Sequence, residues 1–155
     1  MLAAGFALAA ATTLAACGDD DAPSRDESTN EITESGTAEA ASLEVGDCVN
    51  NPDSDQFEDI GAVPCADSHD LEIYHAFDLA DGEYPAEEDI FAEAETECGG
   101  RFEEFVGFPY EDSEIDWDIF FPTSQSWDEF DDREVQCIVF DLNGPVEGTL
   151  EGAGR

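Results

Sequence analysis

The sequence predicts a small α+β domain, in which an antiparallel sheet packs against one or two helices and two disulfides hold the layers together. Three observations predict it: one long amphipathic segment, three short runs rich in β-branched and aromatic residues, and four cysteines beyond residue 42. A chain of 155 residues has room for one domain of ordinary size. Fifteen of the sixteen aromatic residues lie from Phe57 onward, so we place the core in the later two thirds of the chain.

The first sixteen residues are apolar and uncharged, which is typical of the hydrophobic part of a signal peptide. A membrane-spanning helix needs about 20 such residues, so this run is too short to be one. The sequence Leu14-Ala15-Ala16-Cys17 is similar to the lipobox of bacterial lipoproteins, in which the cysteine thiol carries a diacylglycerol. We therefore expect a signal peptide over residues 1–16 and a lipidated Cys17 that anchors the protein to the outer face of the cell membrane, outside the cytoplasm. The alternative is an ordinary signal peptide with a chance cysteine.

Residues 17–42 combine acidic, serine, threonine and alanine side chains, and Ile32 is their one large apolar residue. A segment of this composition buries too little apolar surface to offset the conformational entropy of the chain. We therefore expect a disordered acidic tether after the lipidated cysteine, and a folded domain over residues 43–154.

The charge balance is extreme, with 41 aspartates and glutamates against four arginines and a formal net charge of -37. Nucleic acid is excluded as a partner, because binding phosphates requires clustered lysine and arginine. An anionic lipid surface is excluded for the same reason. We interpret the acidity as halophilic adaptation, in which salt screens a well-hydrated carboxylate surface. The alternative is a surface polyanion that collects cations.

Four cysteines lie in the predicted domain, and an even number in an exported domain indicates two disulfides. Of the three pairings, we choose Cys48 with Cys65, because a hairpin-like return of the chain would bring them together. The second pair is Cys98 with Cys137, because a helix packed on a sheet would join them. The closed loops of 17 and 39 residues would contribute about 3 and about 4 kcal/mol to stability.

Two segments have the residue types of a metal site but not the spacing. The segment "DSDQFEDIGAVP" begins like a calcium-binding EF-hand loop at Asp53, but it lacks the turn glycine and the final glutamate. A zinc set of Cys65, His69, Cys98 and Cys137 matches no common zinc-finger spacing and would compete with disulfide formation outside the cell. We therefore expect no metal and no cofactor.

The helical segment is "PAEEDIFAEAETECGGRFEEFVG", residues 85–107. A period of 3.6 residues places its apolar side chains on one side and its acids on the other. The apolar side consists of Ile90, Phe91, Ala94, Cys98, Phe102, Phe105 and Val106. The glycine pair at positions 99 and 100 costs roughly 1 kcal/mol for each glycine and can split the helix into two.

Three short runs are predicted to be antiparallel strands: "LEIYHAFDL" from residue 71, "DWDIFFPT" from residue 116 and "VQCIVFDL" from residue 135. In the first run, alternation places Leu71, Ile73, His75, Phe77 and Leu79 on one face. His75 is therefore expected in the core. His69 precedes the strand in the polar turn "ADSHD", where side chains can face solvent, so we keep His69 and Asp70 as binding candidates.

The sequence contains no catalytic motif of a specific kind. The Gly-x-Ser-x-Gly nucleophile motif is absent, and with 41 acidic residues any pair of carboxylates arises by chance. We therefore expect no enzymatic activity. The alternative is an envelope glycan or peptide hydrolase that uses a carboxylate pair.

Seven short motifs follow one another along the chain. They are Gly46-Asp47-Cys48, Val63-Pro64-Cys65, His69-Asp70-Leu71-Glu72, Tyr84-Pro85, Pro122-Thr123 with Ser126-Trp127, Asp132-Arg133, and Cys137. In this order they resemble the septum-formation domain family of actinobacterial envelope proteins. Two positions depart from that pattern: Ser68 stands where a proline usually precedes the histidine, and Asp131 stands where a glycine usually precedes Asp132.

The resemblance implies a link to septum formation, cell division or envelope assembly, without a mechanism. We expect a non-catalytic module that binds a division protein, an envelope protein or a cell-wall component. Trp127 and Arg133 join the binding candidates, on the same side as His69. A tryptophan in such a turn-rich segment is more often packed than exposed, and Arg133 is best interpreted as a hydrogen-bonded partner of carboxylates.

Overall fold

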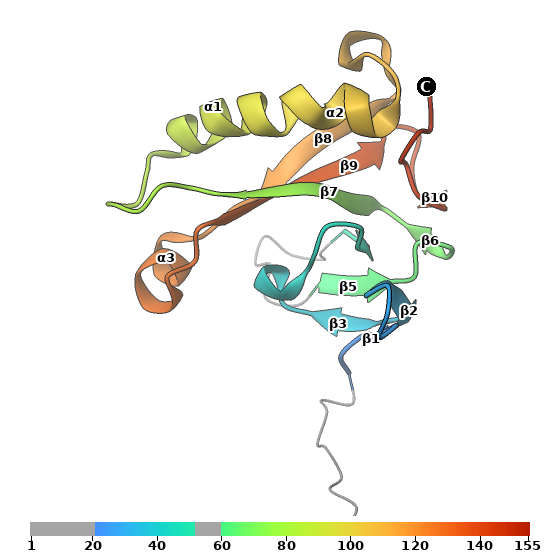
Figure 1. The fold of residues 1–155 in the computed structure, drawn as a ribbon, viewed down its shortest axis with the longest axis horizontal. Helices are drawn as coiled ribbons and strands as arrows, with labels where there is room; N and C mark the ends of the chain where they lie inside the picture. Colours follow the sequence, from blue (N-terminus) through green and yellow to red (C-terminus); the bar gives the residue numbers. More distant parts are fainter. Residues whose placement is uncertain (1–20, 52–59) are drawn as a thin grey trace, which may run out of the picture.

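The computed structural model describes residues 21–51 and 60–155. An antiparallel sheet of six strands lies at the centre, in the order β3, β5, β4, β7, β9, β8, and two helices lie across one face of it (Figure 1). This is the predicted α+β class, and the two predicted disulfides are both present. The signal peptide, Cys17 and the calcium-like loop at Asp53 lie outside the described residues.

The sheet is built from three long strands and three short ones. The long strands are β7 (Leu71–Asp78), β8 (Ile115–Phe120) and β9 (Glu134–Asp141), and the short ones are β3 (Gly36–Ala38), β4 (Cys48–Val49) and β5 (Ile60–Val63). β9 pairs with β7 on one side and with β8 on the other, and both pairings are antiparallel. The three long strands overlap the three predicted runs, and β8 and β9 each begin one residue earlier than predicted. This confirms that their apolar, β-branched and aromatic residues indicate strands.

The long amphipathic segment forms two helices, as the glycine pair predicted. Helix α1 spans Glu87–Glu97, helix α2 spans Gly99–Val106, and Cys98 lies between them. The disulfide from Cys98 to Cys137 fastens this helical layer to β9. Phe91 was expected on the buried side, but it lies at the edge of the apolar stripe and is 45% exposed.

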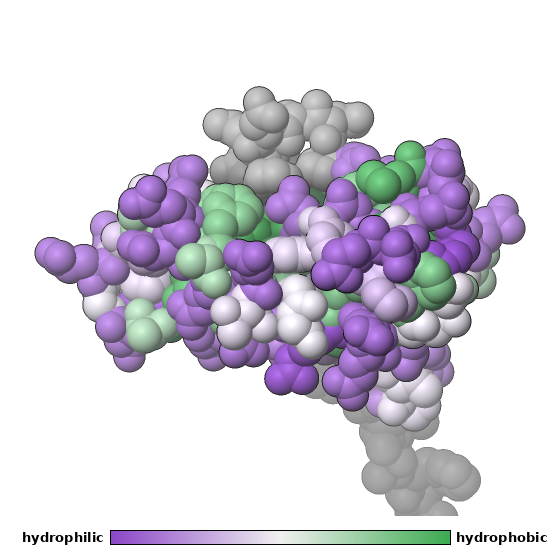
Figure 2. Space-filling model, turned by 90° about the horizontal axis from the view of Figure 1, so that it is seen from above, coloured by the Kyte–Doolittle hydropathy of each residue, from purple (hydrophilic) through white to green (hydrophobic). Residues whose placement is uncertain are grey.

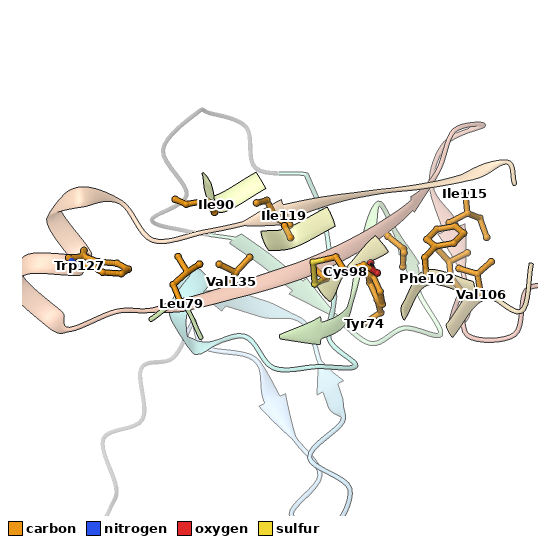
Figure 3. Packing of buried hydrophobic residues seen from close by; sticks show 14 residues of the cluster. Tyr74, Leu79, Ile90, Cys98, Phe102, Val106, Ile115, Ile119, Trp127 and Val135 are labelled. Carbon is orange, nitrogen blue, oxygen red and sulfur yellow. Dashed lines mark hydrogen bonds between the residues drawn. A yellow bond between two sulfur atoms is a disulfide. The ribbon is translucent and has the colours of Figure 1, made fainter. Parts of the chain in front are cut away.

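Each face of the sheet has its own hydrophobic core, because alternate residues of β9 point to opposite sides. The helix-side core contains residues of α1 and α2 and of the sheet. Its side chains are drawn in Figure 3. Its members include Ile90, Phe102, Val106, Ile119, Val135 and Val139. The far-side core lies on the opposite face and includes Ile32, Val49, Ile60, Ile73 and Ile138. The sheet therefore lies between the two cores.

A β-bulge interrupts the alternation in β7. The ladder with β9 shifts register between Ile73 and His75, so Tyr74 is the extra residue. Before the bulge Leu71 packs in the far-side core, and after it Leu79 packs in the helix-side core. The prediction that one face of this strand carries all five alternating residues is therefore wrong.

His75 lies on the helix side of the sheet, opposite Cys137, and is partly buried instead of being a core residue. Its Nε2 lies 3.8 Å from a carboxylate oxygen of Glu97. Burial and the positive charge of Arg101 hold the pKa of His75 below its ordinary value, while Glu97 acts in the opposite direction. The bulge places His75 against the ends of two helices, where its ring meets charged side chains.

The segment before residue 43 is folded where the structure describes it, so the predicted disordered tether is wrong for residues 24–42. Strands β1 (Ser24–Arg25) and β2 (Ile32–Glu34) pair with each other, β3 pairs with β5, and the 3-10 turn η1 (Ala40–Ser42) follows. Ile32 is only 8% exposed and belongs to the far-side core. One isoleucine is enough to hold this segment on the domain, because the far-side core supplies the apolar surface that Ile32 packs against.

Two polar anchors hold this N-terminal segment. The Arg25 guanidinium donates two hydrogen bonds, both of 2.6 Å, to the two carboxylate oxygens of Asp47. The Gln136 side chain in β9 donates to the backbone carbonyls of Ala40 and Leu43, at 3.1 and 3.0 Å. Composition could not indicate these contacts, because the partners lie far along the chain.

The remaining described elements are short. They are strand β6 (Ser68–His69), the 3-10 turn η2 (Tyr110–Asp112), helix α3 (Ser124–Phe130) and strand β10 (Val146–Glu147), which pairs with β6. Seen from the helix side, the surface is predominantly hydrophilic, with separate small hydrophobic areas (Figure 2). This agrees with the surplus of carboxylates in the sequence.

Candidate functional site

The motif residues gather at the two ends of the long strands β7 and β9. Strand β6 adjoins the start of β7, whereas α3 lies beyond the end of β7 and directly before β9 (Figure 1). The β6 end contains Cys48, Cys65, His69, Glu72 and Thr149, and the α3 end contains Tyr84, Trp127, Phe130 and Arg133. The expectation that His69, Trp127 and Arg133 share one side is therefore wrong.

Helix α3 begins at a reciprocal capping box. The Thr123 hydroxyl accepts a hydrogen bond of 3.0 Å from the backbone N–H of Ser126. The Ser126 hydroxyl accepts one of 3.0 Å from the backbone N–H of Thr123. This pattern satisfies two N–H groups that a helix start leaves without partners. The Pro-Thr-x-x-Ser motif is therefore a helix start that fixes the position of Trp127.

Trp127 is buried, as the packing interpretation predicted. Its Nε1–H donates to the backbone carbonyl of Gly82 at 3.1 Å. The edge of the Tyr84 ring packs against it, with ring centroids 5.7 Å apart. The Arg133 guanidinium lies 3.7 Å from the centroid of the indole, which is a cation–π contact. Residues from three of the seven motifs, Tyr84, Trp127 and Arg133, thus pack together at this end.

Every guanidinium nitrogen of Arg133 has an acceptor. The acceptors are the carboxylates of Asp81 and Asp131, at 3.3 and 2.7 Å, and the carbonyls of Trp127 and Asp132, at 3.0 and 2.9 Å. This confirms the interpretation of Arg133 as a hydrogen-bonded partner of carboxylates. Beside it lies a surface depression of about 400 Å³, lined by Leu79, Arg133 and five acidic side chains. The depression therefore favours positively charged groups.

Phe130 is an exposed large apolar residue at the α3 end. It is the last residue of α3 and is 75% exposed. Asp131 follows it in the left-handed conformation, with φ 57°, and ends the helix. The sequence analysis overlooked Phe130. The signal was present, since Phe130 stands between two acidic pairs, Asp128-Glu129 and Asp131-Asp132.

His69 is fully buried, although the sequence analysis expected it to face solvent. It lies in β6 and pairs with Val146 of β10, so the C-terminal strand covers it. Its Nδ1 lies 2.9 Å from the backbone carbonyl of Asp67. Because a carbonyl only accepts, Nδ1 carries a proton, and in the neutral ring Nε2 carries a lone pair. Nε2 is buried and has no hydrogen-bond partner among the described residues.

The neighbouring candidate Asp70 has a local structural role. Its carboxylate accepts a hydrogen bond of 2.8 Å from the backbone N–H of Asn51. Its own backbone N–H donates to the carbonyl of Val49 at 3.1 Å. Asp70 is therefore a link between β4 and the start of β7.

Glu72 is a buried acid that the sequence analysis did not select. Its two carboxylate oxygens accept hydrogen bonds from the Thr149 hydroxyl, at 2.5 Å, and from the backbone N–H of Leu150, at 2.6 Å. Burial raises the pKa of Glu72 above its ordinary value, and these two hydrogen bonds and His69 act in the opposite direction. The His-Asp-x-Glu motif was the signal for this pair.

Cys48 completes a cluster with His69 and Glu72. The cysteine sulfur, one imidazole nitrogen and one carboxylate oxygen all lie within 4.8 Å of one another, and all three residues are buried. Cys48 is bonded to Cys65, with their Cα atoms 5.1 Å apart. The zinc set considered from the sequence is not brought together, since Cys98 and Cys137 form the other disulfide.

The family of the chain is shown by comparison with known protein families. The family model described as septum formation matches residues 9–137 of the 155. The chain belongs to the septum formation family. This confirms the resemblance, and it links the septum-formation domain to cell division or the cell envelope. No curated protein and no solved structure matches the chain. Within residues 21–51 and 60–155 of this septum-formation protein, no helix has both the length and the apolar character that crossing a bilayer requires.

Proposed function

We propose that this septum-formation protein is an actinobacterial lipoprotein, held outside the cytoplasm by Cys17, that binds a division or envelope protein without catalysing a reaction. The match to the septum formation family carries the link to the division machinery. The α3 end supports a binding function. It presents the exposed aromatic side chain of Phe130 on a helix that Trp127 and Arg133 hold in place.

The proposed anchor brings the domain close to the membrane. Strand β1 begins at Ser24, only seven residues after Cys17. Seven extended residues reach at most about 25 Å. A lipid on Cys17 would therefore hold the folded domain near the bilayer surface, and a long acidic tether is not needed.

The proposed contact surface consists of Phe130 and the acidic depression beside Arg133. Phe130 offers the large apolar side chain that protein interfaces use as an anchor. Two acidic residues of the depression, Asp131 and Asp132, directly follow Phe130 in the chain and place negative charge beside it. The partner we propose is therefore a protein with an apolar pocket bordered by lysine and arginine.

The hydrogen bonds at this end support binding over catalysis. Both Trp127 and Arg133 use their side-chain donors to hold neighbouring backbone and carboxylate groups. The single ring N–H of Trp127 and four of the five N–H donors of Arg133 are used in this way, which leaves little hydrogen-bonding capacity for a substrate. Their role is to fix the position of α3, and therefore of Phe130.

In-cell crosslinking of Phe130→Ser against Leu142→Ser tests the proposed contact. Leu142 is the matched control, because it is 62% exposed and lies far from α3, in the turn after β9. We expect Phe130→Ser to lose crosslinked partners and septal localisation, while Leu142→Ser keeps both. Both variants should unfold at the wild-type temperature, because exposed side chains contribute little to stability. Equal partner recovery by the two variants would contradict the proposed surface.

Changing Cys17 tests the anchor independently of the partner. We expect Cys17→Ala to release the protein from the membrane fraction and to remove the acyl mass from the mature N-terminal peptide. An unchanged membrane fraction and peptide mass would contradict the anchor, and would leave the Phe130 comparison valid.

A further inference from the structure

We propose that Cys48, His69 and Glu72 form a site for a divalent metal ion of the Zn²⁺ type, which becomes available when the disulfide between Cys48 and Cys65 is open. The proposal concerns the β6 end and is independent of the contact surface at the α3 end. It rests on the convergence of three buried ligand types and on the free nitrogen of His69.

His69 has the arrangement of a metal ligand that lacks its metal-side partner. Metal-binding histidines usually donate one ring N–H to a carbonyl or carboxylate, which fixes the tautomer and directs the other nitrogen to the metal. Here Nδ1 is held by the carbonyl of Asp67 at 2.9 Å. Nε2 is left with a lone pair in a fully buried position, and none of the described donors reaches it. A buried lone pair without a donor costs stability, so it needs an explanation.

The other two ligands are held in place around His69. Glu72 is positioned by hydrogen bonds from Thr149 and Leu150, and each of its oxygens keeps a second lone pair. Cys48 is fixed in β4, which pairs with β7 directly opposite Glu72. Ligand atoms around tetrahedral zinc lie roughly 3.3–3.8 Å apart, as bonds of about 2.0–2.3 Å require. The three ligand atoms now lie within 4.8 Å of one another, so binding of zinc would draw them closer by about 1 Å.

Opening the disulfide supplies the thiolate. A dithiol reductant breaks the Cys48–Cys65 bond by giving it two electrons and two protons, and the two sulfurs of the reductant become a disulfide. Binding of the metal ion then displaces the thiol protons to water. Cys65 is only half-buried, so the reductant reaches this disulfide through its sulfur. The Cys65 thiolate, whose Cα lies 5.1 Å from that of Cys48, provides the fourth ligand.

The Cys65→Ser variant tests the site without any reductant. It leaves the Cys48 thiol beside His69 and Glu72 and keeps the second disulfide. We expect the full mature chain of this variant to bind one Zn²⁺, measured by elemental analysis after gel filtration. With Co²⁺ it should show a thiolate-to-metal charge-transfer band, which reports the Cys48 sulfur directly. The oxidised wild type should show neither.

Two comparisons assign the ligands. Adding His69→Gln to Cys65→Ser should weaken Zn²⁺ binding by at least ~100-fold, since loss of even an outer partner costs 10–100-fold. The matched control is Cys137→Ser, which frees Cys98 next to His75 and Glu97. These three side chains do not form such a cluster, because among the described residues the set whose ligand atoms all lie within 4.8 Å of one another is Cys48, His69 and Glu72. We expect no charge-transfer band from this control.

Wild-type protein provides a second measurement that does not depend on the folding of a variant. After mild reduction with a phosphine, Zn²⁺ should protect Cys48 and Cys65 from alkylation, as peptide mass spectrometry would show. Absence of Zn²⁺ binding by Cys65→Ser together with unprotected thiols in the reduced wild type would overturn the site. Equal Zn²⁺ binding with and without His69, or by the Cys137→Ser control, would overturn it as well.

Discussion

The α3 end and the β6 end each contain a buried aromatic ring nitrogen, a charged partner and a backbone carbonyl, but they differ in hydrogen bonding. At the α3 end, the ring nitrogen of Trp127 and every guanidinium nitrogen of Arg133 have an acceptor. At the β6 end, His69 keeps a buried nitrogen without a partner. This difference in hydrogen bonding indicates that motifs of one family can have different roles. A fully hydrogen-bonded motif holds the fold, whereas an incompletely bonded one marks a position that can take a further ligand.

The largest expected effect on stability follows from removing the Trp127 side chain at the α3 end. Trp127→Ala deletes a buried indole, its bond to Gly82 and the cation–π contact with Arg133. We expect it to lower the free energy of unfolding by about 3–5 kcal/mol, measured by urea denaturation. His69→Gln should cost only about 1–2 kcal/mol, because His69 makes one ring hydrogen bond. A smaller loss of unfolding free energy for Trp127→Ala than for His69→Gln would contradict the claim that the hydrogen-bonded motif at the α3 end holds the fold.

The second prediction concerns the ion pair beside the β6 end. Arg25 and Asp47 form a two-pronged pair in which Asp47 is only 3% exposed, one residue before Cys48. In a double-mutant cycle of Arg25→Ala and Asp47→Ala, we expect a coupling energy of about 1–3 kcal/mol in urea unfolding. Additive effects of the two substitutions would contradict the folded placement of the N-terminal segment.

Much of the fold could be predicted from the sequence. The helical period of residues 85–107 and the three strand runs are local patterns, and each is long enough to indicate its element. Both disulfide pairings were also predicted correctly. The bulge at Tyr74 could not be predicted, because it depends on how β7 and β9 align and not on either strand alone. The N-terminal strands were missed because Arg25 finds its partner 22 residues away.

The candidate site was predicted less well. The motifs selected His69, Trp127 and Arg133, and the structure shows that the polar atoms of the last two are used within the fold. Burial of His69 depends on β10, whose pairing with β6 brings together residues 68–69 and 146–147. Such a long-range contact leaves no periodic signal in sequence. The exposed Phe130 was overlooked because an apolar residue in a short helix is usually assumed to be buried.

A third prediction tests the helix end that positions Phe130. Asp131 adopts φ 57°, a conformation that costs little for glycine and more for a residue with a Cβ. The family resemblance expects glycine here. Asp131→Gly should raise the free energy of unfolding by about 0.5–1 kcal/mol, because the lost bond to Arg133 involves a carboxylate that is 86% exposed. A loss of stability in thermal or urea unfolding would show that this bond matters more than the backbone.

The smallest expected effect is the pH dependence caused by His75, which lies between the two ends. Its folded pKa lies below the ordinary value of 6.5, because of burial and Arg101, and Glu97 opposes the shift. The unfolded chain therefore binds this proton more readily, so the stabilisation is complete above pH 6.5 and is lost as the pH falls toward the folded pKa. His75→Gln should remove this slope. The difference in unfolding free energy between wild type and variant isolates it from the carboxylates, and an unchanged slope would contradict it.

The order in which the two disulfides open is the most direct test of the claim that the β6 end is the reactive one. Cys98 and Cys137 are both fully buried in the helix-side core, whereas Cys65 is half-buried. Native protein can be treated with a dithiol reductant, alkylated at intervals and mapped by peptide mass spectrometry. We predict that Cys48 and Cys65 are labelled first, while Cys98 and Cys137 remain joined until the domain unfolds. Labelling of Cys98 and Cys137 first, or of all four together, would contradict the account.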